Sequence, residues 1–163
     1  MSQILRVIIL VITVMLMGAC GDLLTVEDKR ISLDGDVYEG SFDRYKGKLI
    51  EGKITFFDGT VEEGTRDKDT GFLIEGKVTF PDGEVYEGTF GKDTGRIIEG
   101  KIIFADGEVQ EGKFDKDTGL LIEGKIIFPD GRISEGRFDK DLGILIEGQR
   151  IDSNGTVEDF RFE

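Results

Sequence analysis

Carboxylates are the groups in this sequence whose type and spacing come closest to a chemical motif. One glutamate recurs at a fixed step of 24 residues: Glu51, Glu75, Glu99, Glu123 and Glu147. Glycoside hydrolysis uses two carboxyl groups about 5–9 Å apart, and their environments must differ so that one keeps its proton while the other is ionised. Four of these glutamates stand in the same Glu-Gly-Lys context, so their environments are alike. We therefore expect a solvated, charged face and no enzyme.

Other catalytic and metal-binding groups are scarce in this sequence. It has no histidine and one cysteine, Cys20. A Ser–His or Cys–His nucleophile pair is therefore impossible, and the commonest metal ligand is missing. A single cysteine also rules out an internal disulfide and a four-thiolate zinc site. We expect no catalytic residue, no cofactor and no structural metal.

Two acidic loops resemble the start of a calcium-binding loop. Asp67–Gly71 and Asp115–Gly119 both read Asp-Lys-Asp-Thr-Gly, which puts hard oxygen ligands at alternate positions. The glutamate that closes an EF-hand loop is absent, because Val78 and Ile126 stand in its place. In the other interpretation, Asp accepts hydrogen bonds from nearby backbone and Gly takes a positive φ. We predict such turns, with weak Ca²⁺ binding as the open alternative.

The charge balance limits the partners that this chain can bind. Its 163 residues include 34 acidic and 21 basic residues, which give a formal net charge of −13. Such a surface repels nucleic-acid phosphates and anionic lipid headgroups. Nucleic acid is therefore excluded as a partner, and the length suits one modest folded domain.

The chain after residue 32 repeats with a period of 24 residues. The most regular mark of the period is an Asp-Gly or Asn-Gly dipeptide, which ends at Gly35, Gly59, Gly83, Gly107, Gly131 and Gly155. Each dipeptide predicts a tight turn between two strands. Segments such as 84–90 and 98–104 alternate like strands on either side of a turn. Loops such as Asp115–Gly119 then reverse the chain into the next hairpin.

These hairpins predict an all-β fold, an elongated single-layer antiparallel sheet of stacked β-hairpin repeats over residues 33–163, about five and a half repeats. One hairpin is unstable by itself, so neighbouring hairpins must share apolar rows. Alternation puts Ile98, Ile102 and Phe104 on one face, with Gly100 between them. Two strands per repeat at about 4.8 Å each give a rod on the order of 50 Å long.

Apolar residues form rows at the same 24-residue step. One row consists of isoleucines: Ile50, Ile74, Ile98, Ile122 and Ile146. Another consists of phenylalanines: Phe42, Phe90, Phe114, Phe138 and Phe162. Arg66 breaks the phenylalanine row. We expect both rows to pack hairpin against hairpin.

The N-terminus has the layout of an export signal. Within residues 1–19 a lone positive charge precedes an apolar run and two small residues, and that run is shorter than the roughly 20 residues that span a bilayer. Leu-Met-Gly-Ala before Cys20 resembles the lipobox of bacterial lipoproteins. The resemblance implies a cleaved signal at 1–19 and, in 20–32, a lipidated Cys20 followed by a short linker. An uncleaved membrane anchor and an ordinary signal remain as alternatives.

The residue after the cysteine indicates which membrane, inner or outer, would hold the lipid anchor. Gly21 stands there, which resembles the outer-membrane type of bacterial lipoprotein. We therefore expect a lipid-anchored protein of the bacterial cell envelope, at the outer membrane in preference to the inner membrane. Several acyl chains make such anchoring durable without a basic patch on the protein.

Two segments carry a family resemblance. Val37–Phe42 and Val85–Phe90 read Val-Tyr-Glu-Gly-Ser-Phe and Val-Tyr-Glu-Gly-Thr-Phe, and they resemble MORN repeats (membrane occupation and recognition nexus). The period is one residue longer than is usual in that family, and the pattern is also similar to MORN-variant repeats of bacterial antitoxin-like proteins. The resemblance spans 33–163 and implies an elongated single-layer sheet. It also implies a lipid-binding role, which an acidic surface disfavours.

Four residues are the candidate contacts with a partner. Tyr38 and Tyr86 lie in the first half of the array, and Ile103 and Ile127 stand where earlier repeats have threonine. We expect a membrane-anchored, non-catalytic scaffold that uses these residues for protein–protein contact, including self-association. The alternatives are an immunity- or antitoxin-like inhibitor that binds a basic toxin by charge complementarity, and a carboxylate-based sugar-active or sugar-binding protein.

Overall fold

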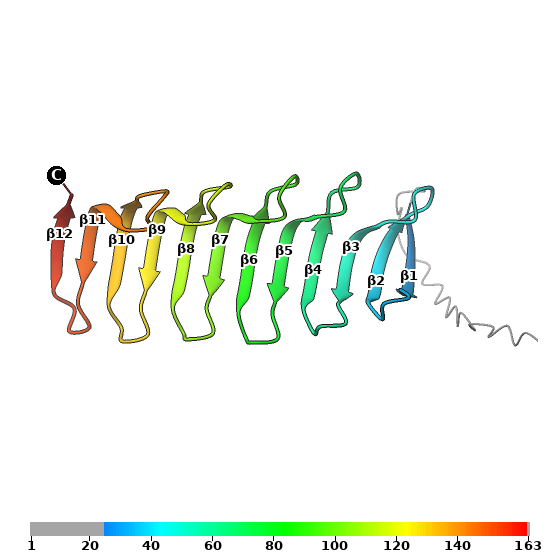
Figure 1. Cartoon of the computed structure of the whole chain (residues 1–163), viewed down its shortest axis with the longest axis horizontal. Helices are drawn as coiled ribbons and strands as arrows, with labels where there is room; N and C mark the ends of the chain where they lie inside the picture. The colour runs from blue at the N-terminus through cyan, green and yellow to red at the C-terminus, as the bar shows by residue number, and fades with distance from the viewer. Residues whose placement is uncertain (1–24, 163) are drawn as a thin grey trace, which may run out of the picture.

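The computed structural model describes residues 25–162. The predicted signal at 1–19 and the predicted lipidation at Cys20 lie outside the described residues. Within them the chain forms twelve strands and no helix (Figure 1). The strands are β1 (Thr25–Ile31), β2 (Val37–Asp43), β3 (Leu49–Thr55), β4 (Val61–Arg66), β5 (Leu73–Thr79), β6 (Val85–Phe90), β7 (Ile97–Ile103), β8 (Val109–Phe114), β9 (Leu121–Ile127), β10 (Ile133–Phe138), β11 (Leu145–Ile151) and β12 (Val157–Arg161).

All twelve strands form one open sheet in sequence order, and each pairs antiparallel with the next. Each strand contacts only its neighbours along the chain, so the molecule is a row with β1 at one end and β12 at the other (Figure 1). Tight turns lie along one long side of this row and longer loops along the other. The prediction of an all-β, single-layer antiparallel sheet of consecutive hairpins is confirmed.

The sheet starts earlier than the sequence indicated, because β1 comes from the segment predicted to be a linker at 20–32. Its pairing with β2 runs from Thr25 opposite Asp43 to Ile31 opposite Val37. Most side chains of β1 are charged or polar, so the apolar alternation that reveals a strand is absent. Backbone pairing with β2 holds it in place, and the exposed Lys29–Glu39 ion pair (2.8 Å) lies across the same two strands.

The Asp-Gly dipeptides form the predicted tight turns. In the turn between β5 and β6, the Phe80 N–H donates to the Glu84 carbonyl (2.9 Å), and the Gly83 N–H donates to the Phe80 carbonyl (3.0 Å). The Asp82 carboxylate accepts from the Glu84 N–H at 3.1 Å. Gly83 has a φ of 95°, which is costly for a residue that has a Cβ.

A β-bulge after each longer loop changes which isoleucines reach the core. Thr89 pairs with Glu99 and Phe90 pairs with Ile97, so Ile98 is an extra residue in β7. Ile97 is consequently 4% exposed, whereas Ile98 is 36% exposed. The expectation that Ile98 shares the core face with Ile102 is therefore wrong, since a bulge shifts the two-residue alternation by one. The buried row is Leu49, Leu73, Ile97, Leu121 and Leu145.

Ten glycines form a stripe across the sheet, one on each of β2 to β11. This glycine stripe consists of Gly40, Gly52, Gly64, Gly76, Gly88, Gly100, Gly112, Gly124, Gly136 and Gly148. Gly88 lies opposite Gly100, and a Cβ on Gly88 would lie 2.1 Å from the Glu99 carbonyl oxygen. The same close approach recurs across every second strand pair, from β2–β3 to β10–β11. Only glycine allows backbones to pack this closely at a φ near 145°.

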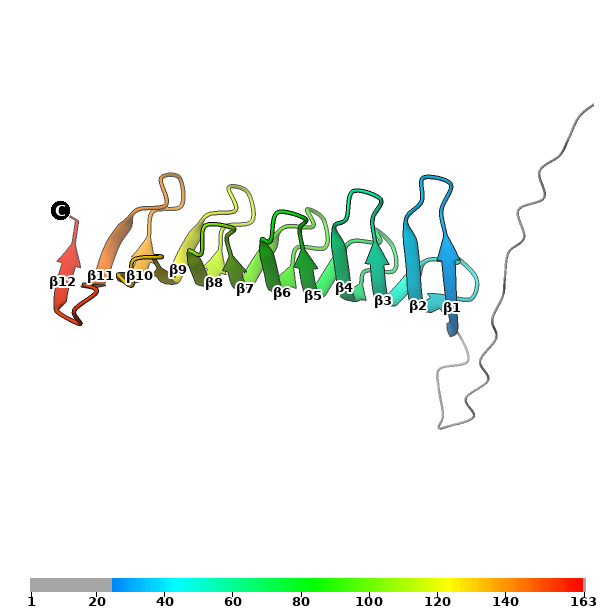
Figure 2. The ribbon, with the colours of Figure 1, turned by 90° about the horizontal axis from the view of Figure 1, so that it is seen from below.

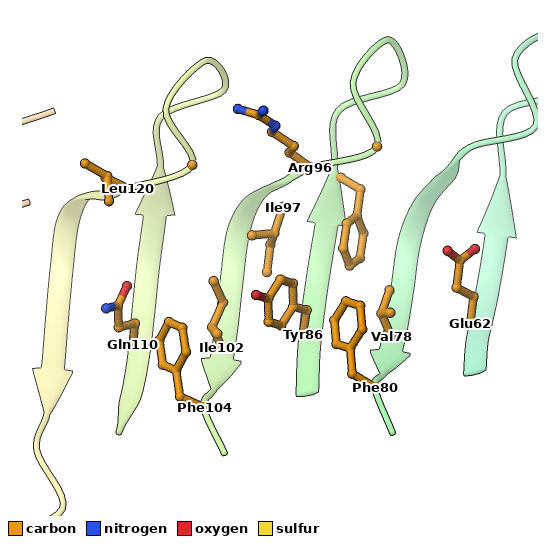
Figure 3. A pocket seen from close by; sticks show the side chains of 13 residues that line it. Glu62, Val78, Phe80, Tyr86, Arg96, Ile97, Ile102, Phe104, Gln110 and Leu120 are labelled. Atoms are coloured by element: carbon orange, nitrogen blue, oxygen red, sulfur yellow. The ribbon is translucent and has the colours of Figure 1, made fainter. Parts of the chain in front are cut away.

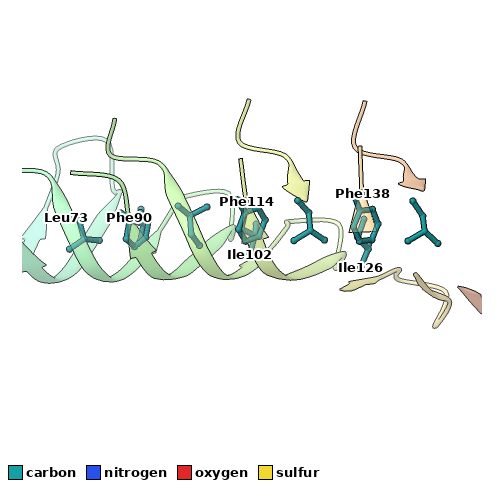
Figure 4. Packing of buried hydrophobic residues seen from close by; sticks show 10 residues of the cluster. Leu73, Phe90, Ile102, Phe114, Ile126 and Phe138 are labelled. Atoms are coloured by element: carbon teal, nitrogen blue, oxygen red, sulfur yellow. The ribbon is translucent and has the colours of Figure 1, made fainter. Parts of the chain in front are cut away.

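The sheet is curved and forms a trough. Most of the turns and loops rise to one side of the row (Figure 2). The strands bend around the buried side chains (Figure 4). We call the face inside the curve the inner face and the opposite face the outer face. The main buried cluster lies on the inner face: Leu73, Val78, Phe90, Ile97, Ile102, Phe114, Leu121, Ile126, Phe138 and Leu145.

The first and last of the described strands carry a residue with a side chain at the register of the glycine stripe. Asp28 of β1 lies opposite Gly40, and Phe160 of β12 lies opposite Gly148. An arginine covers an aromatic ring at each end, with the Arg30 guanidinium 3.8 Å from the centre of Phe42 and that of Arg150 3.8 Å from the centre of Phe160. Phe160 packs on the main cluster, whereas Phe162, which the sequence placed in the phenylalanine row, is exposed.

Candidate functional site

A groove of about 440 Å³ opens on the inner face over β4 to β8 (Figure 3). Its lining is largely apolar. Val78, Tyr86 and Ile102 come from three successive strands, and Phe80 and Phe104 come from the turns that follow β5 and β7. The groove therefore spans two repeats, and neighbouring hairpins build it together. Apolar grooves with a few polar groups are the usual form of a binding site.

Tyr86 lies at the centre of this groove (Figure 3). Its ring meets that of Phe80 edge-on at 5.0 Å between centroids, and its hydroxyl donates to a Glu84 carboxylate oxygen at 3.2 Å. Burial raises the pKa of Tyr86, and the neighbouring Glu84 raises it further. The phenol stays protonated at neutral pH and its proton is held by Glu84, so the groove presents an aromatic ring with a hydroxyl oxygen that can accept.

Tyr38 occupies the matching position on β2, four strands away from Tyr86 on β6. It packs against the smaller buried cluster of Phe42, Leu49 and Ile54. Burial raises the pKa of Tyr38, followed by the charge of Asp36. Both predicted tyrosines therefore lie on the inner face.

One column of the inner face changes its residue type from repeat to repeat. At the 24-residue step it reads Tyr38, Glu62, Tyr86, Gln110 and Ser134. We call these five residues the variable column. In the strand register, aliphatic residues alternate with them: Ile54 opposite Glu62, Val78 opposite Tyr86, Ile102 opposite Gln110 and Ile126 opposite Ser134. The variable column gives each segment of the trough its own chemistry beside these aliphatic residues.

A buried ion pair interrupts the apolar residues of the inner face at β4. Arg66 is 5% exposed and takes the place that phenylalanine has in the other hairpins. Its Nη2 lies 2.7 Å from Glu62 Oε2, and its Nη1 donates to the Gly71 carbonyl at 3.3 Å. The pair lies between the two apolar clusters. Sequence reasoning did not select Glu62 or Arg66, although the gap in the phenylalanine row pointed to Arg66.

Ile103 and Ile127 lie on the outer face, in a row of β-branched residues. Val85 pairs with Ile103, Ile103 with Val109, and Val109 with Ile127. Both isoleucines are half-buried. The four predicted contact residues are thus divided between opposite faces, with the tyrosines in the trough and the isoleucines outside it.

Charged residues form a ladder beside this outer row. Across neighbouring strands Glu87 pairs with Lys101, Lys101 with Glu111, and Glu111 with Lys125. The Lys125 ammonium lies 3.1 Å from Glu111, and both side chains are exposed. Exposed pairs of this kind contribute at most about 1 kcal/mol. The ladder keeps the outer face solvated, and it repeats the same surroundings from strand to strand.

The acidic loops use their carboxylates to hold their own backbone. In the loop before β9, Asp115 Oδ1 accepts from the N–H groups of Asp117 (3.0 Å) and Thr118 (2.8 Å). These bonds, with that of Thr118 first, lower the pKa of Asp115. In the equivalent earlier loop Asp69 pairs with Lys46 at 2.7 Å. Within residues 25–162, no cluster of three or more acidic, histidine or cysteine side chains could hold a metal ion.

The comparisons add no family to this geometry. No protein-family model matches the chain, and no curated protein matches it. In the part of the chain that the structure describes, there is no helix of the length and apolarity that crossing a membrane requires. The site is therefore interpreted from its residues, which form an apolar trough with a variable column.

Proposed function

We propose that this protein is a non-catalytic repeat scaffold, anchored to the membrane of the bacterial cell envelope by a lipid on Cys20, that binds other proteins through its trough. The observation that carries the proposal is the groove on the inner face, where Phe80, Tyr86 and Phe104 are half-buried across consecutive hairpins. Apolar and aromatic surface of this kind is typical of protein interaction sites. The residues lining it do not include a nucleophile with an adjacent base.

The anchor and the body suit each other physically. Acyl chains bind a membrane by burying methylene groups, so the acidic body does not need to attract lipid headgroups. A body with a net negative charge is repelled by an anionic membrane surface, which favours presenting the trough to other proteins. The lipobox-like segment before Cys20 and Gly21 after it support an outer-membrane position.

The acidic charge supports one other function, that of an immunity- or antitoxin-like inhibitor. A negative surface accelerates encounter with a basic partner and favours its selection. Such an inhibitor would form a stoichiometric complex with one basic protein, and high salt would weaken that complex. A scaffold would instead contact several envelope proteins or further copies of itself.

Site-specific cross-linking in cells tests the scaffold proposal. A photoreactive phenylalanine analogue replaces Tyr86 in the trough, and in a control chain it replaces the exposed Lys101 of the outer face. We expect protein adducts from position 86 and far fewer from position 101. Equal adducts from both positions, or none from position 86, would overturn the proposal. Intact mass of the same samples reports whether Cys20 is the lipid-modified N-terminus.

A further inference from the structure

The Glu62–Arg66 pair is an exception within the repeat. In the equivalent places four of the other five hairpins carry an uncharged residue of the variable column together with a buried phenylalanine: Tyr38 with Phe42, Tyr86 with Phe90, Gln110 with Phe114 and Ser134 with Phe138. The last hairpin, β11–β12, has Glu158 and an exposed Phe162 there. The fold therefore does not require a charged pair at this point. Replacing a buried ion pair by apolar residues often stabilises a protein, so stability does not explain why this hairpin differs.

The two members of the pair differ in access. The guanidinium of Arg66 is enclosed, and within the described residues its Nε and Nη2 have no hydrogen-bond acceptor, so the 2.7 Å contact of Nη2 with Glu62 is an ion pair and not an aligned hydrogen bond. Glu62 has a side chain that is 24% exposed, and it lines the groove. A carboxylate can accept about four hydrogen bonds, and Arg66 engages only Oε2. Glu62 can therefore bind a donor that enters from the trough, whereas Arg66 cannot be reached from it.

The charges around the groove favour a cation as that donor. Glu84 lies against Tyr86, and Glu108 accepts from the Gln110 side chain at 2.8 Å. Arg96 is the cation among the side chains lining the groove, and its guanidinium donates to the Asp117 carbonyl. A cationic group entering the groove from the partner thus meets the Glu62 carboxylate in the lining, and the carboxylates of Glu84 and Glu108 lie behind the lining residues Tyr86 and Gln110.

The spacing of the variable column indicates the shape of the partner. Glu62 lies two strands from Tyr38 and two from Tyr86, a separation of about 9.6 Å at the usual strand spacing. A polyproline II segment has three residues per turn and rises about 3.1 Å per residue. Its side chains therefore return to the same side about every 9.3 Å, which matches the step of the column. A fully extended β-segment would turn every third side chain to its opposite face.

We propose that Glu62 binds a lysine or arginine side chain of a partner protein whose segment lies along the trough in polyproline II conformation. Apolar side chains three residues before and three residues after that cation fill the places beside Tyr38 and Tyr86. The inference rests on the proposed function, and it names the partner chemistry of the same trough. Arg66 is a positioning residue, because it holds the Glu62 carboxylate at the groove.

Two synthetic peptides and one double variant test this inference. The peptides are Leu-Pro-Pro-Lys-Pro-Pro-Leu and the same sequence with Glu in place of Lys, and their binding to the full mature chain is measured by calorimetry. The variant Glu62→Gln/Arg66→Phe installs the Gln110/Phe114 combination that this chain already carries in β8. It removes the charge without leaving Arg66 buried and unpaired, and circular dichroism confirms that it folds. Glu63→Gln is the matched control, since Glu63 is the exposed neighbour of Glu62 in β4.

We expect the wild-type chain to bind the lysine peptide at least tenfold more tightly than the glutamate peptide. The double variant should lose this preference, and the Glu63 control should keep it. Equal binding of both peptides by the wild-type chain would overturn the role of Glu62 and leave the trough as a protein-binding surface. Binding of neither peptide would overturn the inference, and cross-linking at position 86 would then decide the proposed function separately. Lysine amide binding as tightly as the lysine peptide would also overturn it, because a free cation would then be sufficient.

Discussion

Gly88 and Gly100 face each other across β6 and β7 at a distance that leaves no room for a side chain on either residue. A Cβ on Gly100 would lie 2.2 Å from the Glu87 carbonyl oxygen and 2.7 Å from the Gly88 Cα. Both contacts are with backbone, which has no rotamer to change. The glycine stripe therefore sets how closely the hairpins pack, and its loss at one point should affect the whole local sheet.

Gly100→Ala should destabilise the protein by roughly 4 kcal/mol or more, the range that severe steric disruption produces. Gly107→Ala is the matched control, because Gly107 also has a positive φ, 91°, but nothing lies within 4 Å of its would-be Cβ. The control should cost only about 1–2 kcal/mol from backbone strain. Urea unfolding followed by circular dichroism measures both variants. Equal losses would contradict the close approach across β6 and β7.

The bulge in β7 predicts opposite results for two neighbouring isoleucines. Ile97→Ala removes a side chain that is 4% exposed, and it should lower the free energy of unfolding by about 2–5 kcal/mol. Ile98→Ala alters a side chain that is 36% exposed and should cost less than about 1 kcal/mol. Thermal and urea denaturation of the two variants provides the test. A larger loss at Ile98 would restore the simple alternation and contradict the bulge.

The acidic loops should be sensitive to low pH. The Thr118 N–H, followed by that of Asp117, lowers the pKa of Asp115 in the folded protein. A carboxyl whose folded pKa is lower than its unfolded value, near 3.9, contributes stability above that value. This contribution is lost as the pH falls through the folded pKa. The protection of the Thr118 amide against exchange, corrected for the intrinsic pH dependence, should therefore fall as the pH drops below the unfolded value and through the lower folded pKa of Asp115.

Asp115→Asn supplies the control for this pH effect. Asparagine keeps an oxygen that can accept the same two backbone bonds, but it does not titrate. Thr118 exchange in the variant, corrected for the intrinsic pH dependence, should lack the acid step. An acid step of unchanged size would assign the effect to another group.

The residues at the two open edges should limit growth of the sheet. Each even-numbered strand from β2 to β10 approaches the strand that follows it closely, through the facing glycines. β12 has no strand after it among the described strands of the sheet, so its free edge is the side on which such a close approach would occur. The side chains of Phe160 there, and of Asp28 on the free side of β1, would stand in the way of a strand approaching as closely as β6 approaches β7. The variant Asp28→Gly/Phe160→Gly should therefore associate end to end, because both edges then offer an unpaired strand with room beside it.

Sedimentation velocity over a range of concentrations measures this association. The double variant should form larger species as concentration rises, relative to the wild-type chain. Each single variant opens one edge only and should not form long assemblies. A double variant that sediments like the wild-type chain at every concentration would contradict the capping role of these two residues.

The hairpins and the single sheet could be predicted from sequence because their causes are local. An Asp-Gly dipeptide at a fixed step requires a turn at Gly83 and at each equivalent position, and two strands per turn follow from the apolar alternation. The core row could not be predicted in the same way. The bulge adds Ile98 on one strand only, and an alternation rule has no means of detecting an added residue.

The candidate site was predictable in part, for a related reason. Tyr38 and Tyr86 stand out because the chain has only three tyrosines, and both lie in the trough. Ile103 and Ile127 are apolar like the core residues, but the alternation of side chains along their strands places them on the outer face. Glu62 and Arg66 are four residues apart on a strand, and alternation alone gives their shared face but not the contact that the curvature of the sheet produces.

Because each strand contacts only its neighbours, the fold does not fix the number of 24-residue repeats. Removing a unit of 24 residues would leave every remaining strand with a neighbour of the same type, and it would shorten the rod by about 10 Å. The order of the variable column, Tyr38, Glu62, Tyr86, Gln110 and Ser134, is therefore independent of the fold. Recombination between repeats could delete, duplicate or reorder these residues while the sheet keeps its architecture.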